Sequence, residues 1–197
     1  MSIPHRHLLA AALVVVAGYP THLAAQAAQQ SQPAPAAFDA RSAAHLRDAY
    51  LADLDTVHAK IVALAEAIPE DKYAWRPSAG VRSVSEVLMH VAGEWYFYTP
   101  RSIAGNAPAD FGAPRETLPK LEKIAGKQEV LAELTKSWAH CKAQVAAADP
   151  SQLTGSYKPW GIPLDYAAFS MAGDLHEHLG QLIAYSRSVG VKPPWSK

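Results

Sequence analysis

The sequence is nearly free of cysteine: among its 197 residues, the one cysteine is Cys141. A single cysteine excludes a disulfide within the chain and a zinc site built from several thiolates. The stability of the fold must therefore come from apolar packing, and we expect Cys141 to be buried.

An excess of either charge is also missing. Lysine and arginine together number 18, and aspartate and glutamate together also number 18. No cluster of basic residues forms the positively charged surface that nucleic-acid binding requires. We therefore expect no DNA or RNA partner.

Near the N-terminus, the apolar run over residues 8–16 is too short for a transmembrane helix, which needs about 20 apolar residues. It follows Arg6 and precedes Ala25-Gln26-Ala27, the A-x-A pattern that signal peptidases read. These features predict a cleavable signal peptide over residues 1–27, cut after Ala25 or Ala27, and a periplasmic or secreted protein with no stable membrane anchor. The alternative is an uncleaved N-terminal anchor.

Residues 28–38 have no hydrophobic period and are rich in Ala, Gln, Ser and Pro. This composition is typical of a flexible linker. The remaining residues, 39–197, suit a single domain with its own core.

No strand pattern competes with the 3.6-residue period, which appears four times in this domain. The periodic segments cover about residues 40–67, 83–98, 131–145 and 164–189. Residues that begin or end helices stand at their boundaries: a Ser83–Glu86 capping box, Pro69, Pro100, Pro150, Gly190 and Pro193. We predict an all-α fold, a four-helix bundle preceded by the signal peptide.

Polar residues interrupt two of the apolar stripes. His178 stands where the fourth segment calls for an apolar residue, and Asp174 lies one turn earlier on nearly the same side of the helix. In the second segment, His90 borders the stripe and Glu94 follows one turn later. Burying an aspartate without a partner costs several kcal/mol, so a cation, a metal or a dense set of hydrogen bonds must compensate.

Imidazole nitrogens and carboxylate oxygens suit zinc, nickel, iron or manganese, and three protein ligands leave a position for a water molecule. We predict a divalent-metal site built from His90, Asp174 and His178. The alternatives are structural, because an inward histidine can be a hydrogen-bonded core residue. Asp174 can also pair with an arginine such as Arg82, or orient His178 as an outer hydrogen-bond acceptor.

Two further residues are candidates for moving a proton, Glu94 and His58, which borders the stripe of the first segment. The alternatives are a hydrogen-bonding role for Glu94 and a half-exposed packing role for His58. His176 lies about 200° around the helix from Asp174, so we expect it to serve packing or the surface.

Three stretches carry a family resemblance: Trp75-Arg76-Pro77, the sequence SVSEVLMHVA over residues 83–92, and HEHLGQLIAY over residues 176–185. With them, the chain resembles the DinB-like superfamily of four-helix-bundle metalloenzymes over roughly residues 43–195. The resemblance implies a metal, usually zinc or nickel, held by one histidine on the second helix and two ligands one turn apart on the fourth. His90 and His178 match these positions, and the remaining one, commonly histidine, falls on Asp174.

Relatives of this kind include thiol-dependent transferases and isomerases that use mycothiol or bacillithiol. Low-molecular-weight thiols are not kept reduced outside the cytoplasm, so export favours hydrolysis. Our leading hypothesis is a metal-dependent enzyme, a hydrolase or a thiol-dependent transferase, that acts on a small molecule. The alternatives are a non-catalytic module that binds a small ligand or a metal, and a structural domain that forms a homodimer through helix faces rich in Ala and Gly. An enzyme would have the loops over residues 103–121 and 149–165 flanking the metal.

Overall fold

The computed structural model describes residues 39–154 and 158–197. Within these residues every regular element is helical and there is no strand, which confirms the predicted all-α class. No helix in the same residues combines the length and hydropathy of a membrane span. The predicted signal peptide and linker fall in residues 1–38, outside the described residues, and stay predictions.

In the described part of the chain, four long helical segments carry the fold. They are α2 (Ala40–Ala67), α3 (Val84–Gly93) continued by a π-helical turn η2 (Glu94–Tyr98) and by α4 (Thr99–Arg101), α6 (Lys127–Ala147), and α7 (Leu164–Ser188). Shorter helices connect them: η1 (Glu70–Lys72), α5 (Pro114–Leu121), η3 (Pro150–Thr154) and η4 (Pro159–Gly161).

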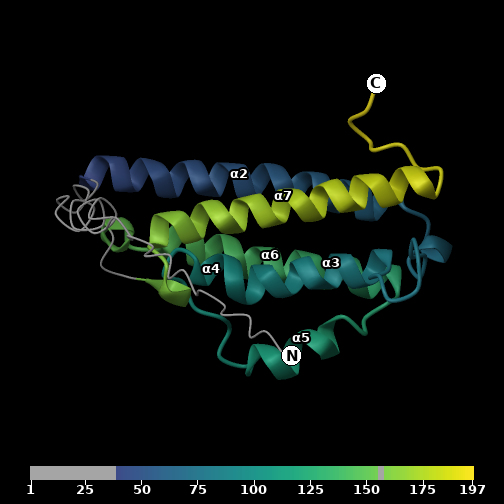
Figure 1. The fold of residues 1–197 in the computed structure, drawn as a ribbon, viewed down its shortest axis with the longest axis horizontal. Helices are drawn as coiled ribbons and strands as arrows, with labels where there is room; N and C mark the ends of the chain where they lie inside the picture. Colours follow the sequence, from purple (N-terminus) through teal and green to yellow (C-terminus); the bar gives the residue numbers. More distant parts are fainter. Residues whose placement is uncertain (1–38, 155–157) are drawn as a thin grey trace, which may run out of the picture. The chain divides into compact units, whose positions relative to one another are not determined.

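The long helices contact one another in the cyclic order α2, α7, α3, α6, which is the arrangement of a four-helix bundle (Figure 1). Each of them turns its apolar stripe inward, and the side chains that fill the core are almost completely buried. Among the largest are Leu54, Ile61, Leu64, Leu88, Trp95 and Leu134. Cys141 is also buried, as predicted. Burying one such aliphatic side chain contributes about 1.5–3 kcal/mol, so this core is the main source of stability.

Local signals set the ends of the helices that hold the site. The Ser83 side chain accepts a hydrogen bond from the Glu86 N–H at 3.3 Å, and Glu86 Oε2 accepts one from the Ser83 N–H at 2.7 Å. This confirms the predicted capping box, a type of cap worth about 1 kcal/mol. Asp39 caps α2 in the same manner by accepting from the Ser42 N–H at 2.7 Å.

The second segment changes its hydrogen bonding before it ends. Over Glu94–Tyr98 the helix is of the π type, and the Thr99 N–H bonds to the Glu94 carbonyl, five residues back. An α-helical turn then restarts at Thr99, so Pro100 stands in its first turn, where a missing N–H breaks no hydrogen bond. Single π-turns of this kind often occur at functional sites.

The sequence analysis treated residues 103–121 as a loop, but they include the helix α5. Pro114 suits its first position, since a proline there lacks only an N–H that has no helical partner. The helix packs on α3 at Gly93, where a Cβ atom would collide with the Leu118 side chain. The bare backbone of Gly93 therefore lets α5 approach the second segment closely.

Candidate metal centre

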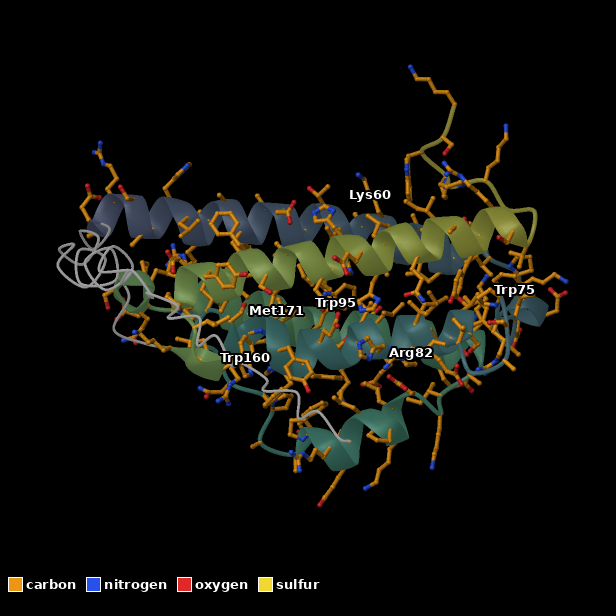
Figure 2. The ribbon with its side chains drawn as sticks, in the orientation of Figure 1. Lys60, Trp75, Arg82, Trp95, Trp160 and Met171 are labelled. Carbon is orange, nitrogen blue, oxygen red and sulfur yellow. The ribbon has the colours of Figure 1, made fainter. Side chains whose placement is uncertain are left out.

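The segments α3–η2 and α7 run antiparallel, and their facing side chains form successive layers along the seam between them. Tyr185 Oη donates a hydrogen bond to the Arg82 carbonyl at 3.2 Å at one end of the seam. His90 and His178 face each other in the next layer, with ring centroids 5.0 Å apart. In Figure 2, Arg82 lies toward one end of the seam and Met171 toward the other.

Three side chains converge in the middle of this seam. Nε2 of His90 lies 3.2 Å from Glu94 Oε1, and Nε2 of His178 lies 3.3 Å from the same oxygen. One donor atom from each of the three residues falls within 4.8 Å of the other two. A single ion could therefore contact all three residues.

The other nitrogen of each imidazole is held by an outer acceptor. His90 Nδ1 donates to Glu122 Oε1 at 2.9 Å, and His178 Nδ1 donates to Gln181 Oε1 at 3.2 Å. Outer acceptors of this kind fix the tautomer of a metal-binding histidine and leave the lone pair of Nε2 free for the metal. Both imidazoles are thus arranged as metal ligands usually are.

Arg82 connects the two outer acceptors. Its guanidinium group donates to Glu122 Oε1 from Nη2 at 3.1 Å and from Nε at 3.2 Å. Gln181 Nε2 donates to Tyr185 Oη at 3.0 Å, and that hydroxyl donates to the Arg82 carbonyl. One residue at the start of the second segment therefore supports the hydrogen-bond chains behind both histidines.

Glu94 carries the negative charge of the centre, and it is 3 % exposed. Burial would raise its pKa, but the hydrogen bonds with His178 and His90 outweigh burial and lower the pKa of Glu94 to about 2. Burial lowers the pKa of His178, whereas the Glu94 carboxylate reverses this effect and raises it above the ordinary value. Glu94 and His178 therefore favour each other's charged form.

Asp174 stands beside this charged group. Burial and the nearby Glu94 carboxylate raise the pKa of Asp174 to about 6. The two carboxyl groups are close enough to share a hydrogen bond when one of them holds a proton. The second carboxylate oxygen of Glu94, Oε2, is buried and finds no hydrogen-bond donor among the described residues.

These observations fit a divalent metal. Two imidazole Nε2 atoms and one carboxylate oxygen converge, and the other oxygen of the same carboxylate is buried and has no donor while Asp174 is ionised, so a bound cation would stabilise the site. Two histidines and one glutamate form a donor set that zinc takes in catalytic sites, with a further coordination position left for water.

The comparison with protein families agrees with this geometry. A family model described as the DinB superfamily matches residues 53–182. The chain belongs to the DinB superfamily. The matched region contains all three converging residues as well as Asp174. A comparison with curated proteins found no match for this chain.

In this DinB superfamily protein the structure brings His90 and His178 together, as the sequence analysis expected of metal ligands. The converging carboxylate comes from Glu94, which we had considered for proton transfer, whereas Asp174 lies next to Glu94 and outside the group of three. The alternative pairing of Asp174 with Arg82 does not occur, because the Arg82 guanidinium is paired with Glu122.

The other two histidines of the sequence analysis lie elsewhere. His58 is stacked on Trp138, with ring centroids 4.4 Å apart and planes 11° apart, and its ring is 5.3 Å from Trp95. In the described part of the chain no hydrogen bond, ion pair or ring contact joins His58 to the three converging side chains. His176 turns toward α2, where its Nε2 lies 3.1 Å from both carboxylate oxygens of Asp53.

Sequence reasoning missed the outer acceptors of this DinB superfamily site. Gln181 could have been found, since it follows His178 by three residues and so shares its side of the helix. Glu122 could not, because it is 32 positions from His90 and reaches it only through the packing of α5 on α3.

Proposed function

We propose that this DinB superfamily protein is an exported, divalent-metal-dependent hydrolase of a small molecule, with His90, Glu94 and His178 as the metal ligands. The observation that carries the proposal is the convergence of two Nε2 atoms on Glu94 Oε1, with each Nδ1 held by an outer acceptor. Zinc or nickel suits this donor set best, and iron or manganese is an alternative.

A metal bound by these residues would polarise a substrate carbonyl and acidify a water molecule. The side chains of the protein supply the rest of the chemistry. Gln181 and Glu122 keep the imidazoles oriented, and the Asp174 carboxyl stands beside the ligands, where it can accept a proton from an attacking water. The histidine side chains are 20 % and 15 % exposed, so a small molecule can reach them from solvent.

Hydrolysis is preferred to thiol transfer because of the proposed export. Support for export comes from the short apolar run at residues 8–16 and the A-x-A pattern that ends at Ala27. Outside the cytoplasm water is available, whereas a reduced low-molecular-weight thiol is not maintained.

One observation favours a second reading. Because Glu94 raises the pKa of His178, a proton on that histidine could neutralise the buried carboxylate without any metal. The centre would then be a charged hydrogen-bond network within a non-catalytic binding module.

Elemental mass spectrometry on the mature protein, purified without a metal-binding tag, separates the two readings. The variants to compare are the double substitution His90→Ala/His178→Ala and the control His176→Ala, which changes a histidine on the other side of the same helix. We expect near-stoichiometric metal in the wild type and in the control, and none in the double variant.

A protein that takes up no metal after incubation with zinc, nickel or manganese would contradict the proposal and favour the charged network. A protein that holds metal but turns over no ester or amide would be a binding module rather than an enzyme. Turnover that requires an added thiol would point to the transferase.

A further inference from the structure

The seam that holds the metal centre continues into a small pocket. The pocket measures about 280 Å³ and is lined mainly by apolar and aromatic side chains: Tyr98, Trp160, Ile162, Ala167, Ser170 and Met171. Tyr98 follows Glu94 by four residues, and Met171 precedes Asp174 by three and His178 by seven, so the pocket lies about one turn beyond the centre on η2 and about two turns beyond it on α7. Figure 2 shows Met171 and Trp160 near each other at this part of the seam.

Trp160 forms the rim of this pocket in an unusual backbone conformation. Its φ is 53° and its ψ is 21°, which is the left-handed region that bulky residues rarely adopt. Such a conformation is strained for a residue that carries a Cβ atom. Trp160 is nevertheless 44 % exposed, and its ring lies 6.2 Å from that of Tyr98. A large aromatic surface is thus left open to a ligand.

Arg101 adds a positive charge at the same rim. Its guanidinium carbon lies 5.7 Å from the centre of the Phe97 ring and 6.0 Å from that of Trp160. Neither an ion pair nor a hydrogen bond joins this guanidinium to any residue in 39–154 or 158–197. A guanidinium group matches the planar geometry of a carboxylate, and no described carboxylate satisfies it.

We propose that this pocket and Arg101 form the substrate-recognition subsite of the enzyme, which takes a small carboxylate-bearing molecule with one aromatic ring or branched alkyl group. The volume is slightly below that of pockets that hold a whole drug-sized ligand, so it fits a single ring-sized group. The ring contacts Trp160, Tyr98 and Met171, and the carboxylate pairs with Arg101. The placement of the reacting part of the molecule at the metal ligands, farther along the same seam, rests on the proposed hydrolase function.

A second pocket, of about 430 Å³, lies between α2 and α7 and is more apolar, but its surroundings differ. Phe169 lines it, 67 % exposed, and the charged residues beside it, Asp53 and His176, already pair with each other. It therefore presents no unpaired charge, and Phe169 offers a matched control for Trp160.

Binding of 4-fluorophenylacetate, followed by ¹⁹F NMR, tests the subsite, with 2-(4-fluorophenyl)ethanol as the neutral analogue. Trp160→Gly removes the ring and suits the left-handed backbone, so the fold should persist. We expect it to raise the Kd of the acid about tenfold. Arg101→Gln should raise it about threefold, since the charge is exposed. Phe169→Ala and Arg187→Gln are matched changes on α7 outside the subsite, and they should leave the Kd of the acid within about twofold. The Kd of the alcohol should not change in Arg101→Gln.

The inference is overturned if the wild type does not bind the acid, or if both subsite variants bind the acid as the wild type does. It is also overturned if Phe169→Ala weakens acid binding as much as Trp160→Gly does.

Metal analysis of the same samples keeps the two proposals apart. Acid binding that depends on Trp160 and Arg101 in a protein that takes up no metal supports the subsite and contradicts the hydrolase. If the protein holds metal and the variants at Trp160 and Arg101 bind the acid as tightly as the wild type does, the subsite alone is contradicted. Cobalt(II) loading should broaden the ¹⁹F signal of the bound acid, and unchanged width would place the probe away from the centre and overturn the inference.

Discussion

His176 and His178 lie two residues apart on α7 and face different surroundings. His178 points into the seam with α3–η2, where its side chain is 15 % exposed and has hydrogen-bonding partners on both nitrogens. His176 points toward α2, where its side chain is 47 % exposed and has Asp53 as its one described partner. Both histidines contact a carboxylate. What distinguishes the centre is that a second helix brings another imidazole to the same buried oxygen.

The sharpest test of this comparison removes each histidine in turn. His178→Ala should weaken zinc binding at least about 100-fold, because it removes a ligand, whereas His176→Ala should leave the affinity within about twofold. Competition with a chromophoric zinc chelator gives both dissociation constants. Equal affinities for the two variants would mean that the seam does not hold the metal.

The next test compares the two acidic residues of the seam. Glu94→Gln removes the carboxylate on which both imidazoles converge and should weaken zinc binding by about 30-fold to 100-fold. Asp174→Asn should change it no more than about threefold, since Asp174 lies outside the three converging groups. The same chelator competition measures both. A larger loss in Asp174→Asn would assign the third ligand to Asp174, as the sequence analysis first predicted.

A smaller effect is expected from the outer acceptors. Gln181→Ala and Glu122→Gln each leave one imidazole without its Nδ1 partner and should weaken zinc binding about tenfold. Glu177→Gln, which changes an exposed residue on α7, the helix that also carries Gln181, is the matched control. If the two outer variants and the control bind zinc equally well, the imidazoles do not need the outer chain to stay oriented.

The smallest effect concerns His58, a histidine packed against tryptophans rather than against a buried carboxylate. Burial lowers the pKa of His58 to about 4, and the charge of Lys142 acts in the same direction while Asp55 opposes it. The folded state thus binds fewer protons than the unfolded state between about pH 6.5 and 4. This contribution to stability is complete above pH 6.5 and is lost as the pH falls toward 4.

His58→Phe keeps a ring against Trp138 but cannot be protonated. Because His58 is half-exposed, we expect the variant to lose about 1 kcal/mol less free energy of unfolding than the wild type between pH 7 and 4.5. Urea denaturation at several pH values measures the difference. Parallel curves for the two proteins would show that His58 is not protonated on unfolding.

The helices themselves could be predicted closely. The first periodic segment was expected at about residues 40–67, and the helix is Ala40–Ala67. The capping box at Ser83 was likewise visible. These features depend on residues within a turn or two of each other, which is why periodicity reveals them. The eight-residue helix α5 was missed, because it contains two prolines and depends on contact with Gly93.

The candidate site likewise has features that the sequence predicted and features that it did not. His90 and His178 stood out because each is a polar residue at or beside an apolar stripe, which is a local pattern. The proposed role of Glu94 as a metal ligand was not predicted. The π-turn that begins at Glu94 depends on hydrogen bonds that no pattern of residues in the sequence indicates. The pocket at Trp160 was also hidden, because its walls come from three separate segments.

The sequence by itself therefore determined the all-α class, the approximate positions of the long helices and the two histidines of the centre, because helix formation and amphipathic patterning act over a few neighbouring residues. Only the tertiary structure decided which carboxylate meets both imidazoles and that Glu122 and Gln181 hold them from behind. It also placed the Arg101 guanidinium, which pairs with no carboxylate of the described residues, beside an aromatic pocket. These properties depend on the packing of distant segments, where a shift of one helical turn would replace every facing pair along the seam.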